Sequence, residues 1–215
     1  ITSTGANVVL ASGNLLLGDA VNVGTNSLVN SGANVQLAGA LAVTGNYSQT
    51  AGVLNVGSNI LSVSGAANIT GGTIAANLSA TGNYLVGSGG TLVSAGAGSS
   101  YSGASIVVGG LTGLKAVSTV SGNSLLMSFA NNYVGGSLSA INNTGSLSAA
   151  TAVYIASTGN LGALNNSGTL SGNITNLSGR ALVINGGSGS VGTLTGGAIT
   201  STGANVVLAS GNLLL

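Results

Sequence analysis

The sequence has no cysteine, no histidine and no proline in its 215 residues, and Asp19 is its single acidic residue. Without cysteine and histidine the chain can form neither a disulfide framework nor a zinc site. General acid–base catalysis requires a side chain that titrates near the operating pH, and a serine nucleophile requires a neighbouring base. We therefore predict that the protein is not an enzyme, has no catalytic or metal-binding residues, and uses no cofactor.

Charge is almost as scarce, because Asp19, Lys115 and Arg180 are the only charged residues and the net charge is +1. They make up 1% of the chain, whereas an ordinary globular domain has about 25%. Phosphate binding requires clustered lysine and arginine, so we expect no nucleic-acid partner. A surface without charge lacks the usual protection against self-association. The expected partner is therefore the protein itself, through axial continuation of repeats and lateral bundling.

Long apolar runs are also missing, although the mean hydropathy is high at +0.61. The runs at 8–11, 15–17 and 106–108 stop after three or four residues, whereas a membrane-spanning helix needs about 18. We therefore expect no insertion into a membrane, and we attribute the high hydropathy to an assembly that buries apolar surface.

Glycine is abundant, with 39 residues spread between short segments of Val, Leu, Ile, Ser, Thr and Asn. This punctuation is typical of strands and turns, and a helix would lose about 1 kcal/mol at each interior glycine. Apolar and polar residues alternate in the segment at 54–65, where Leu54 and Val56 share one side and Asn55 points to the other. The pattern predicts an all-β fold with half-buried strands.

The seventeen residues ITSTGANVVLASGNLLL occur twice, at 1–17 and at 199–215, which sets a period of 198 residues. We interpret 1–198 as one complete tandem repeat unit and 199–215 as the start of the next. The chain begins at Ile1 and ends in three leucines, so we expect it to be a window of a longer array. Residues 199–215 should then repeat the conformation of residues 1–17. The predicted repeat junction consists of Leu15, Leu16, Leu17 and Ile199.

Weaker repeats lie inside the long one. Segment 21–33 recurs at 54–66, TGNY at 44–47 recurs at 81–84, and 136–148 recurs at 159–171. The shifts are 33, 37 and 23 residues, a drift that stacked coils with turns of variable length produce. With about 20 residues in each coil, we predict a parallel β-helix, or β-solenoid, of about 9–11 coils per repeat.

The segment at 97–135 departs from this pattern. It contains Tyr101, Lys115, Met127, Phe129 and Tyr133, which include the only methionine and the only phenylalanine of the chain. One interpretation is a wider coil face where neighbouring filaments make lateral contact. The alternative is a larger core pocket filled by big side chains, because such residues are usually buried.

Two further patterns concern glycine and asparagine. Gly187, Gly189 and Gly192 form a literal G-x-G-x-x-G, but a dinucleotide site also needs a following helix and a downstream acidic residue, and strand-like sequence follows instead. Paired asparagines at 142–143 and 165–166 occupy matching repeat positions. We predict that their amides form hydrogen-bonded ladders between successive coils.

The segments TGNYSQTAGVLNVG at 44–57 and NNSGTLSGNITNLSG at 165–179 resemble the repeats of bacterial filamentous-haemagglutinin-type exoproteins and autotransporter passenger domains. The likeness implies a right-handed parallel β-helix, exported to the bacterial cell surface, that serves adhesion, cell aggregation or biofilm structure. The Asn-Pro signature of the family's secretion domain cannot occur in a chain without proline. The low charge and the near-identical tandem unit favour a structural fibre over an individual adhesin.

These observations lead to three hypotheses. The first is a structural repeat of an extracellular filament that supports adhesion, cell aggregation or a biofilm matrix. The second is an adhesin that binds glycans, or cell or abiotic surfaces, through the irregular segment at 97–135. The third is an ice-binding solenoid, which would need T-x-T at the same point of every coil, whereas TST at 2–4 and TLT at 193–195 are isolated.

Overall fold

The computed structural model describes residues 1–215 and contains no helix. The strands are stacked in parallel coils that form a β-solenoid of about 10 turns, which confirms the predicted fold and coil number. No helix is therefore present that could span a membrane. The handedness of the solenoid stays a prediction.

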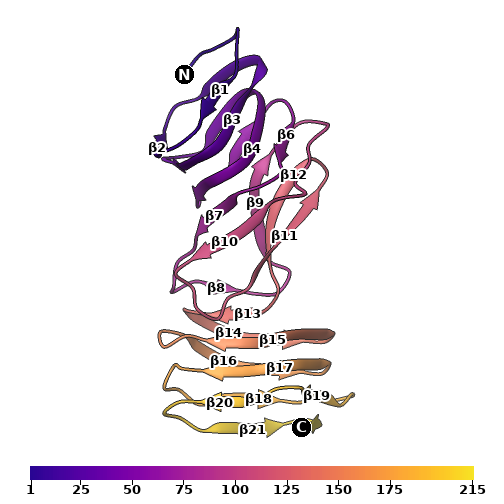
Figure 1. Ribbon diagram of the computed structural model, residues 1–215. Helices are drawn as coiled ribbons and strands as arrows, with labels where there is room; N and C mark the ends of the chain where they lie inside the picture. The colour runs from indigo at the N-terminus through magenta and orange to yellow at the C-terminus, as the bar shows by residue number, and fades with distance from the viewer. The chain divides into compact units, whose positions relative to one another are not determined.

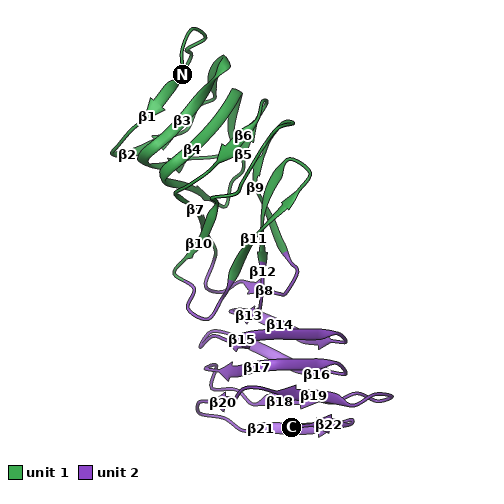
Figure 2. Ribbon diagram, turned by 45° about the vertical axis from the view of Figure 1, so that its right-hand side comes forward, with its two compact units in different colours: residues 1–78, 89–110, 116–128 green, residues 79–88, 111–115, 129–215 purple.

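The chain divides into two compact units (Figure 2). Unit 1 comprises 1–78, 89–110 and 116–128, and unit 2 comprises 79–88, 111–115 and 129–215. The chain therefore passes from one unit to the other several times between 78 and 129. Each unit is described by itself below.

The strands of unit 1 belong to one 11-stranded sheet, which curves as the chain winds from coil to coil (Figure 1). Its strands are β1 (Val8–Leu10), β2 (Asn14–Leu17), β3 (Val21–Leu37), β4 (Leu41–Gly57), β5 (Leu61–Val63), β6 (Ala67–Ile69), β7 (Thr73–Asn77), β9 (Gly89–Ser94), β10 (Ser105–Gly109), β11 (Ala116–Ser121) and β12 (Ser124–Phe129). The two longest strands, β3 and β4, have 17 residues each and run side by side in parallel.

Successive coils of unit 1 are about 20 residues apart. Val8 pairs with Leu28, Leu28 pairs with Tyr47, and Tyr47 pairs with Ala67, so the four residues form one row across four coils. The predicted alternation holds, because Leu54 is buried at 1% exposure while its outward neighbours on β4 are only partly covered.

The 33-residue repeat does not correspond to coil stacking. The strand that starts at Val21 pairs with the one that starts at Leu41, and Leu54 pairs with Val35. The similarity between 21–33 and 54–66 therefore reflects the common strand–turn composition and not a structural period.

Unit 2 contains a 7-stranded and a 4-stranded sheet. The first consists of β8 (Asn83–Tyr84), β13 (Asn132–Val134), β15 (Ser146–Ile155), β17 (Thr169–Asn176), β19 (Gly192–Thr195), β20 (Ile199–Ser201) and β22 (Leu213–Leu214). The second consists of β14 (Ser137–Asn143), β16 (Asn160–Asn166), β18 (Leu182–Asn185) and β21 (Val206–Ser210). The two sheets alternate along the chain, so each coil of unit 2 contributes strands to both.

The 23-residue repeat is a true coil period. Leu138 pairs with Leu161 and Leu147 pairs with Leu170, so equivalent residues of 136–148 and 159–171 lie directly on one another. Their inward side chains form a dry core with those of the coils that follow, for example Leu164, which is fully buried.

Parallel stacking is interrupted where the chain passes between the units. Strand β12 pairs with β9 in antiparallel orientation, and β13 pairs with β8 in antiparallel orientation. The TGNY segment at 81–84 therefore enters an antiparallel pair through β8, while its counterpart at 44–47 lies in the parallel strand β4. The 37-residue repeat is not a coil period.

Candidate functional site

The second copy of the repeated segment, 199–215, forms a regular coil at one end of unit 2. Its three strands each lie parallel on a strand of the coil before: Ile199 on Ile174, Val206 on Leu182, and Leu213 on Gly192. The segment therefore does not fold back on itself as a cap.

The first copy, 1–17, is a regular coil of unit 1 that is covered by the coil after it. Strand β1 pairs with β3 through Val8 and Leu28, and β2 pairs with β3 through Leu15 and Val35. The two copies also share the same central turn, because Gly13 and the equivalent Gly211 both have positive φ angles, +86° and +77°.

The copies differ in what covers their inward side chains. Leu10 is 8% exposed and the equivalent Leu208 is 54% exposed; Leu17 is 9% exposed and Leu215 is 69% exposed. Leu16, which points outward in its strand, has a similar exposure to its equivalent in the second copy. The difference is therefore confined to residues that a stacked coil would cover.

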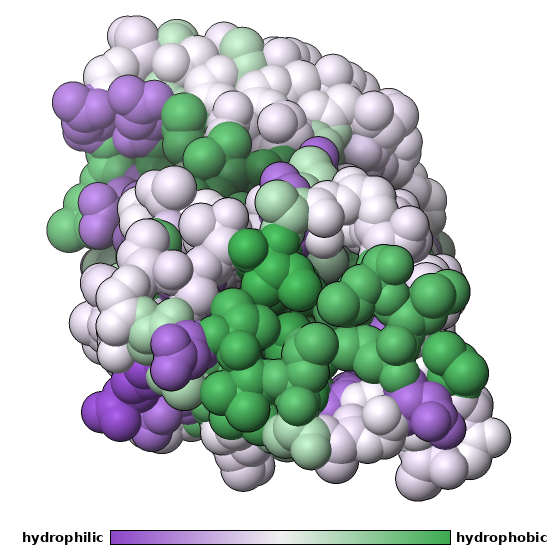
Figure 3. All heavy atoms as spheres, turned by 90° about the horizontal axis from the view of Figure 1, so that it is seen from below, coloured by the Kyte–Doolittle hydropathy of each residue, from purple (hydrophilic) through white to green (hydrophobic).

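Together these residues leave an apolar surface at the end of unit 2, which we call the end face. It consists of the inward residues Val206, Leu208 and Leu215, all of them exposed, and the outward Val207 and Leu214 adjoin it. Figure 3, which looks at the molecule from below the view of Figure 1, shows a large apolar patch on this side.

The four residues predicted to form the repeat junction fall into two groups. Leu15, Leu16 and Leu17 belong to β2 and lie opposite Val35, Gln36 and Leu37 in the register of β3. Ile199 starts β20 and lies on Ile174. Their role in a junction between repeats stays a prediction.

Asparagine ladders occur where the sequence predicted them. The Asn165 amide donates to the Asn142 side-chain oxygen at 2.7 Å, and the Asn185 amide donates to the Asn165 oxygen at 2.8 Å. The hydroxyl of Ser210, in the end coil, donates to the Asn185 oxygen at 2.9 Å. One ladder therefore continues through four coils and ends at the end face.

The inner asparagines of the same pairs also meet. The Asn143 amide donates to the Asn166 side-chain oxygen at 2.7 Å, and Asn166 is fully buried. The Asn166 amide donates in turn to the Thr193 carbonyl at 3.0 Å. These bonds satisfy polar groups in the interior, where an unpaired amide would cost roughly 1–3 kcal/mol.

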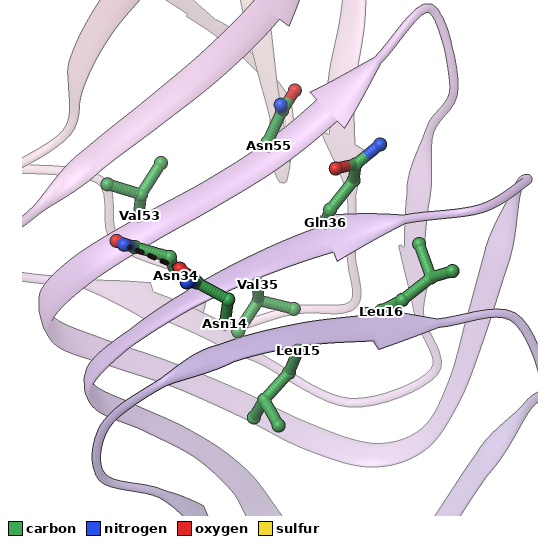
Figure 4. Close-up of a pocket in the computed structure, with 8 residues that line it drawn as sticks. All are labelled: Asn14, Leu15, Leu16, Asn34, Val35, Gln36, Val53 and Asn55. Atoms are coloured by element: carbon green, nitrogen blue, oxygen red, sulfur yellow. Dashed lines mark hydrogen bonds between the residues drawn. The ribbon is translucent and has the colours of Figure 1, made fainter.

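In unit 1 an open groove of about 500 Å³ lies on the outer surface of β2, β3 and β4 (Figure 4). It is lined by Asn14, Leu15, Leu16, Asn34, Val35, Gln36, Val53 and Asn55. The Asn34 amide donates to the Asn14 side-chain oxygen at 3.1 Å. The polar lining consists of neutral carboxamides, which can form hydrogen bonds but cannot transfer protons near neutral pH. Sequence analysis did not single out this groove.

Tyr101 and Met127, from the irregular segment, lie in unit 1 and are buried at 8% and 5% exposure. The Tyr101 hydroxyl donates to the Asn123 carbonyl at 2.7 Å. Burial raises the pKa of this hydroxyl above its ordinary value, and the pKa is lowered again by a hydrogen bond with Ser99. The two side chains fill the interior, as the core alternative proposed.

Phe129 and Tyr133 lie in unit 2 and are buried in an aromatic cluster. Tyr84 contacts both rings, at centroid distances of 5.2 Å and 5.9 Å, and Tyr154 stacks on Tyr133 at 5.7 Å. Burial raises the pKa of Tyr133, and the neighbouring Tyr154 and Tyr84 raise it further. Sequence analysis missed Tyr84 and Tyr154, because they lie far from Tyr133 in the chain.

Of the five residues proposed for lateral contact, only Lys115 is exposed. Its backbone N–H donates to the Asn131 side-chain oxygen at 2.8 Å. A lateral contact through Lys115 stays a prediction, whereas the four large side chains of the group belong to the interior of their units.

The G-x-G-x-x-G sequence lies in the connection between β18 and β19, and the Gly187 N–H donates to the Asn212 carbonyl at 3.1 Å. The strand β19 begins at Gly192, where a dinucleotide site would need a helix. The glycines therefore form a turn that lies against the end coil.

Comparison of the chain with protein-family models, with curated proteins and with solved structures gives no match.

Proposed function

We propose that this protein is a structural repeat of a secreted bacterial surface filament, in which each 198-residue unit continues the strand stacking of the unit before. The observation that carries the proposal is the conformation of 199–215. This segment lies as a regular coil on its predecessor and leaves an apolar face open, while the identical residues 1–17 are covered by another coil.

The mechanism is mechanical. Within each unit, backbone hydrogen bonds run from coil to coil, and the inward Val, Leu and Ile side chains form a buried core. The asparagine ladder adds a second line of hydrogen bonds in the same direction. Because every coil is held by its neighbours, stability accumulates along such an array as a sum of nearest-neighbour terms.

The extracellular location is supported by sequence properties. A chain without cysteine needs no oxidative folding and can cross an outer membrane unfolded, and its repeats resemble those of exported haemagglutinin-type proteins. A neutral surface of Ser, Thr and Asn permits bundling of filaments and the adhesion, aggregation or matrix roles that bundling serves.

Immunogold labelling of intact cells with an antibody raised against this chain tests the location, and fibre diffraction of the labelled material tests the architecture. The expected result is labelled surface filaments with an axial spacing of about 4.8 Å. Labelling confined to the cell interior, or filaments without that spacing, would overturn the proposal.

Neither alternative gains support from a specific observation. A glycan-binding adhesin would use exposed aromatic rings at 97–135, but Tyr101, Phe129 and Tyr133 are buried. An ice-binding face would need aligned T-x-T motifs, but Thr193 and Thr195 lie on Thr169 and Ser171, so the motif is lost within one coil.

A further inference from the structure

The end face has a defined complement within the chain itself. Residues 199–215 are identical to 1–17, and residues 1–17 are covered by β3. A coil with the same sequence and the same conformation as 1–17 can pair with the same strand, β3. We infer that the end face is covered by β3, Val21–Leu37, of the next tandem repeat, in which 199–215 take the place of 1–17 as the first coil; β3 of a separate chain is already paired with its own β1, β2 and β4. The inference rests on the proposed function.

The register of this contact follows from the first copy. Val8 to Leu10 pair with Leu28 to Asn30, and Asn14 to Leu17 pair with Asn34 to Leu37. Shifted by the 198-residue period, the pairing places Val207 beside Val29 of the following copy and Leu215 beside Leu37 of the following copy. Every inward side chain of β3 from Val21 to Leu37 is at most 3% exposed in its own coil, so these residues have the shape and hydropathy to seal Leu208 and Leu215.

Three polar contacts hold β3 on the first copy. The Asn26 amide donates to the Thr4 carbonyl at 3.0 Å, and the Asn34 amide donates to the Asn14 side-chain oxygen at 3.1 Å. In the third, the Ser27 N–H donates to the Asn7 side-chain oxygen at 2.9 Å.

The equivalent acceptors of the second copy are the Thr202 carbonyl and the side-chain oxygens of Asn205 and Asn212. Neither asparagine side chain forms a hydrogen bond in the structure, whereas Asn7 and Asn14 do. Asn205 and Asn212 are therefore two polar positions that β3 of the following copy would satisfy, in addition to the apolar contacts.

A close approach of the two backbones fixes the register further. A Cβ atom at Gly32 would lie 2.5 Å from the Ala11 carbonyl oxygen, which is closer than real Cβ atoms come. In the inferred contact the same glycine of the following copy lies over Ala209. A slip of one residue would place Ala33 or Ser31 at this point and would also turn the apolar side chains of β3 away from the end face.

Disulfide formation in a polypeptide of two tandem repeats tests the inference, because the natural chain has no cysteine. The test variant carries Val207→Cys together with Val29→Cys in the following copy. Opposed residues of neighbouring parallel strands lie about 4.8 Å apart, within the Cα separation that a disulfide accepts. The offset variant carries Val207→Cys together with Ser31→Cys in the following copy.

A matched control links Val207 to the strand of the preceding coil. Val207 pairs with Val183 in the structure, so Val183→Cys with Val207→Cys should lose its free thiols whatever covers the end face. The expected result is loss of free thiols in the control and test variants and their retention in the offset variant.

A cross-link in the offset variant would overturn the inferred register, and a cross-link in the control variant alone would overturn the inferred occupant. The filament proposal would still stand in either case if fibre diffraction shows the axial spacing. Absence of both the spacing and the control cross-link would instead contradict the stacked end coil, and with it the proposed function.

Discussion

The same seventeen residues occur in two environments in this molecule. In the first copy Leu10 and Leu17 are buried, and in the second copy the equivalent Leu208 and Leu215 are more than half exposed. Both copies form two apolar strands at corresponding positions and share a positive φ angle at the central glycine. The comparison shows that the sequence of a coil determines its conformation, while the coil stacked on it determines its burial.

Not every detail is common to both copies. Gly203 has a positive φ angle of +83°, but the equivalent Gly5 does not. This turn precedes the first apolar strand of each copy, where the coils that lie beside the two copies differ in sequence. The common part of the conformation is therefore the pair of apolar strands and the turn that joins them.

The largest expected effect is the difference in stability lost when the same leucine is replaced by alanine in the buried and in the exposed copy. Leu10→Ala should lower the free energy of unfolding of unit 1 by about 2–3 kcal/mol, because it removes a buried side chain and leaves a cavity. Leu208→Ala in the single repeat should cost less than about 1 kcal/mol. Urea unfolding measures both, and in a two-repeat polypeptide the two substitutions should become equally costly. Equal costs in the single repeat would contradict the comparison.

Alkaline pH should affect the first copy through Tyr47, which shares a row with Val8 and Leu28 and is 2% exposed. Burial raises the pKa of the Tyr47 hydroxyl well above its ordinary value. Below about pH 10 the hydroxyl is neutral in both states, and above it the unfolded chain ionises first. Stability should therefore fall by about 1.4 kcal/mol per pH unit above 10.

The row that supports the second copy contains no tyrosine, because Leu208 lies on Ile184, Ile184 on Leu164, and Leu164 on Ile141. Hydrogen exchange measured between about pH 9 and 11 should show a larger alkaline loss in β1 and β3 than in β18 and β21, because Tyr133, the tyrosine of unit 2 whose pKa is raised, lies outside the row that supports the second copy. Tyr47→Phe should reduce the loss in β1 and β3 to the part that Tyr101 of unit 1 contributes. An unchanged loss in that variant would show that Tyr47 is not its origin.

The central turn should respond equally in both copies. Gly13→Ala and Gly211→Ala each force a side chain into a left-handed backbone conformation, at a cost of about 1–2 kcal/mol. Local opening measured by hydrogen exchange around each turn should rise by a similar factor. A clear inequality would show that the two turns differ in conformation.

The smallest expected effect concerns a polar contact. Asn14→Ala should lower stability by about 0.5–1 kcal/mol, because Asn34 then loses its acceptor. Asn212→Ala should have no measurable effect in the single repeat and should match Asn14→Ala in the two-repeat polypeptide. Asn185→Ala, which breaks an observed ladder, serves as the positive control.

The sequence predicted those features that depend on local pattern. The alternation of apolar residues predicted the inward side of β4. The repeated asparagines predicted the ladder from Asn142 to Asn165, because β14 and β16 pair at a constant shift of 23 residues, the same as the sequence repeat. The burial of the large side chains at 97–135 followed from residue type, as the alternative to lateral contact.

The division into two units and the antiparallel pairs could not be predicted in the same way. Strand β8 pairs with β13, some 50 residues away, and the cluster of Tyr84, Phe129 and Tyr133 depends on that long-range pairing. The exposure of the end face was also beyond local pattern, because Leu208 has the same sequence neighbours as Leu10.

The most direct test of continued stacking is a cryo-electron-microscopy structure of the two-repeat polypeptide. We expect 199–215 to lie between β18 and β19 on one side and β3 of the next repeat on the other, with Leu208 and Leu215 buried and strands about 4.8 Å apart along the axis. A density map in which 199–215 folds back as a terminal cap, or in which the end face stays uncovered, would contradict it.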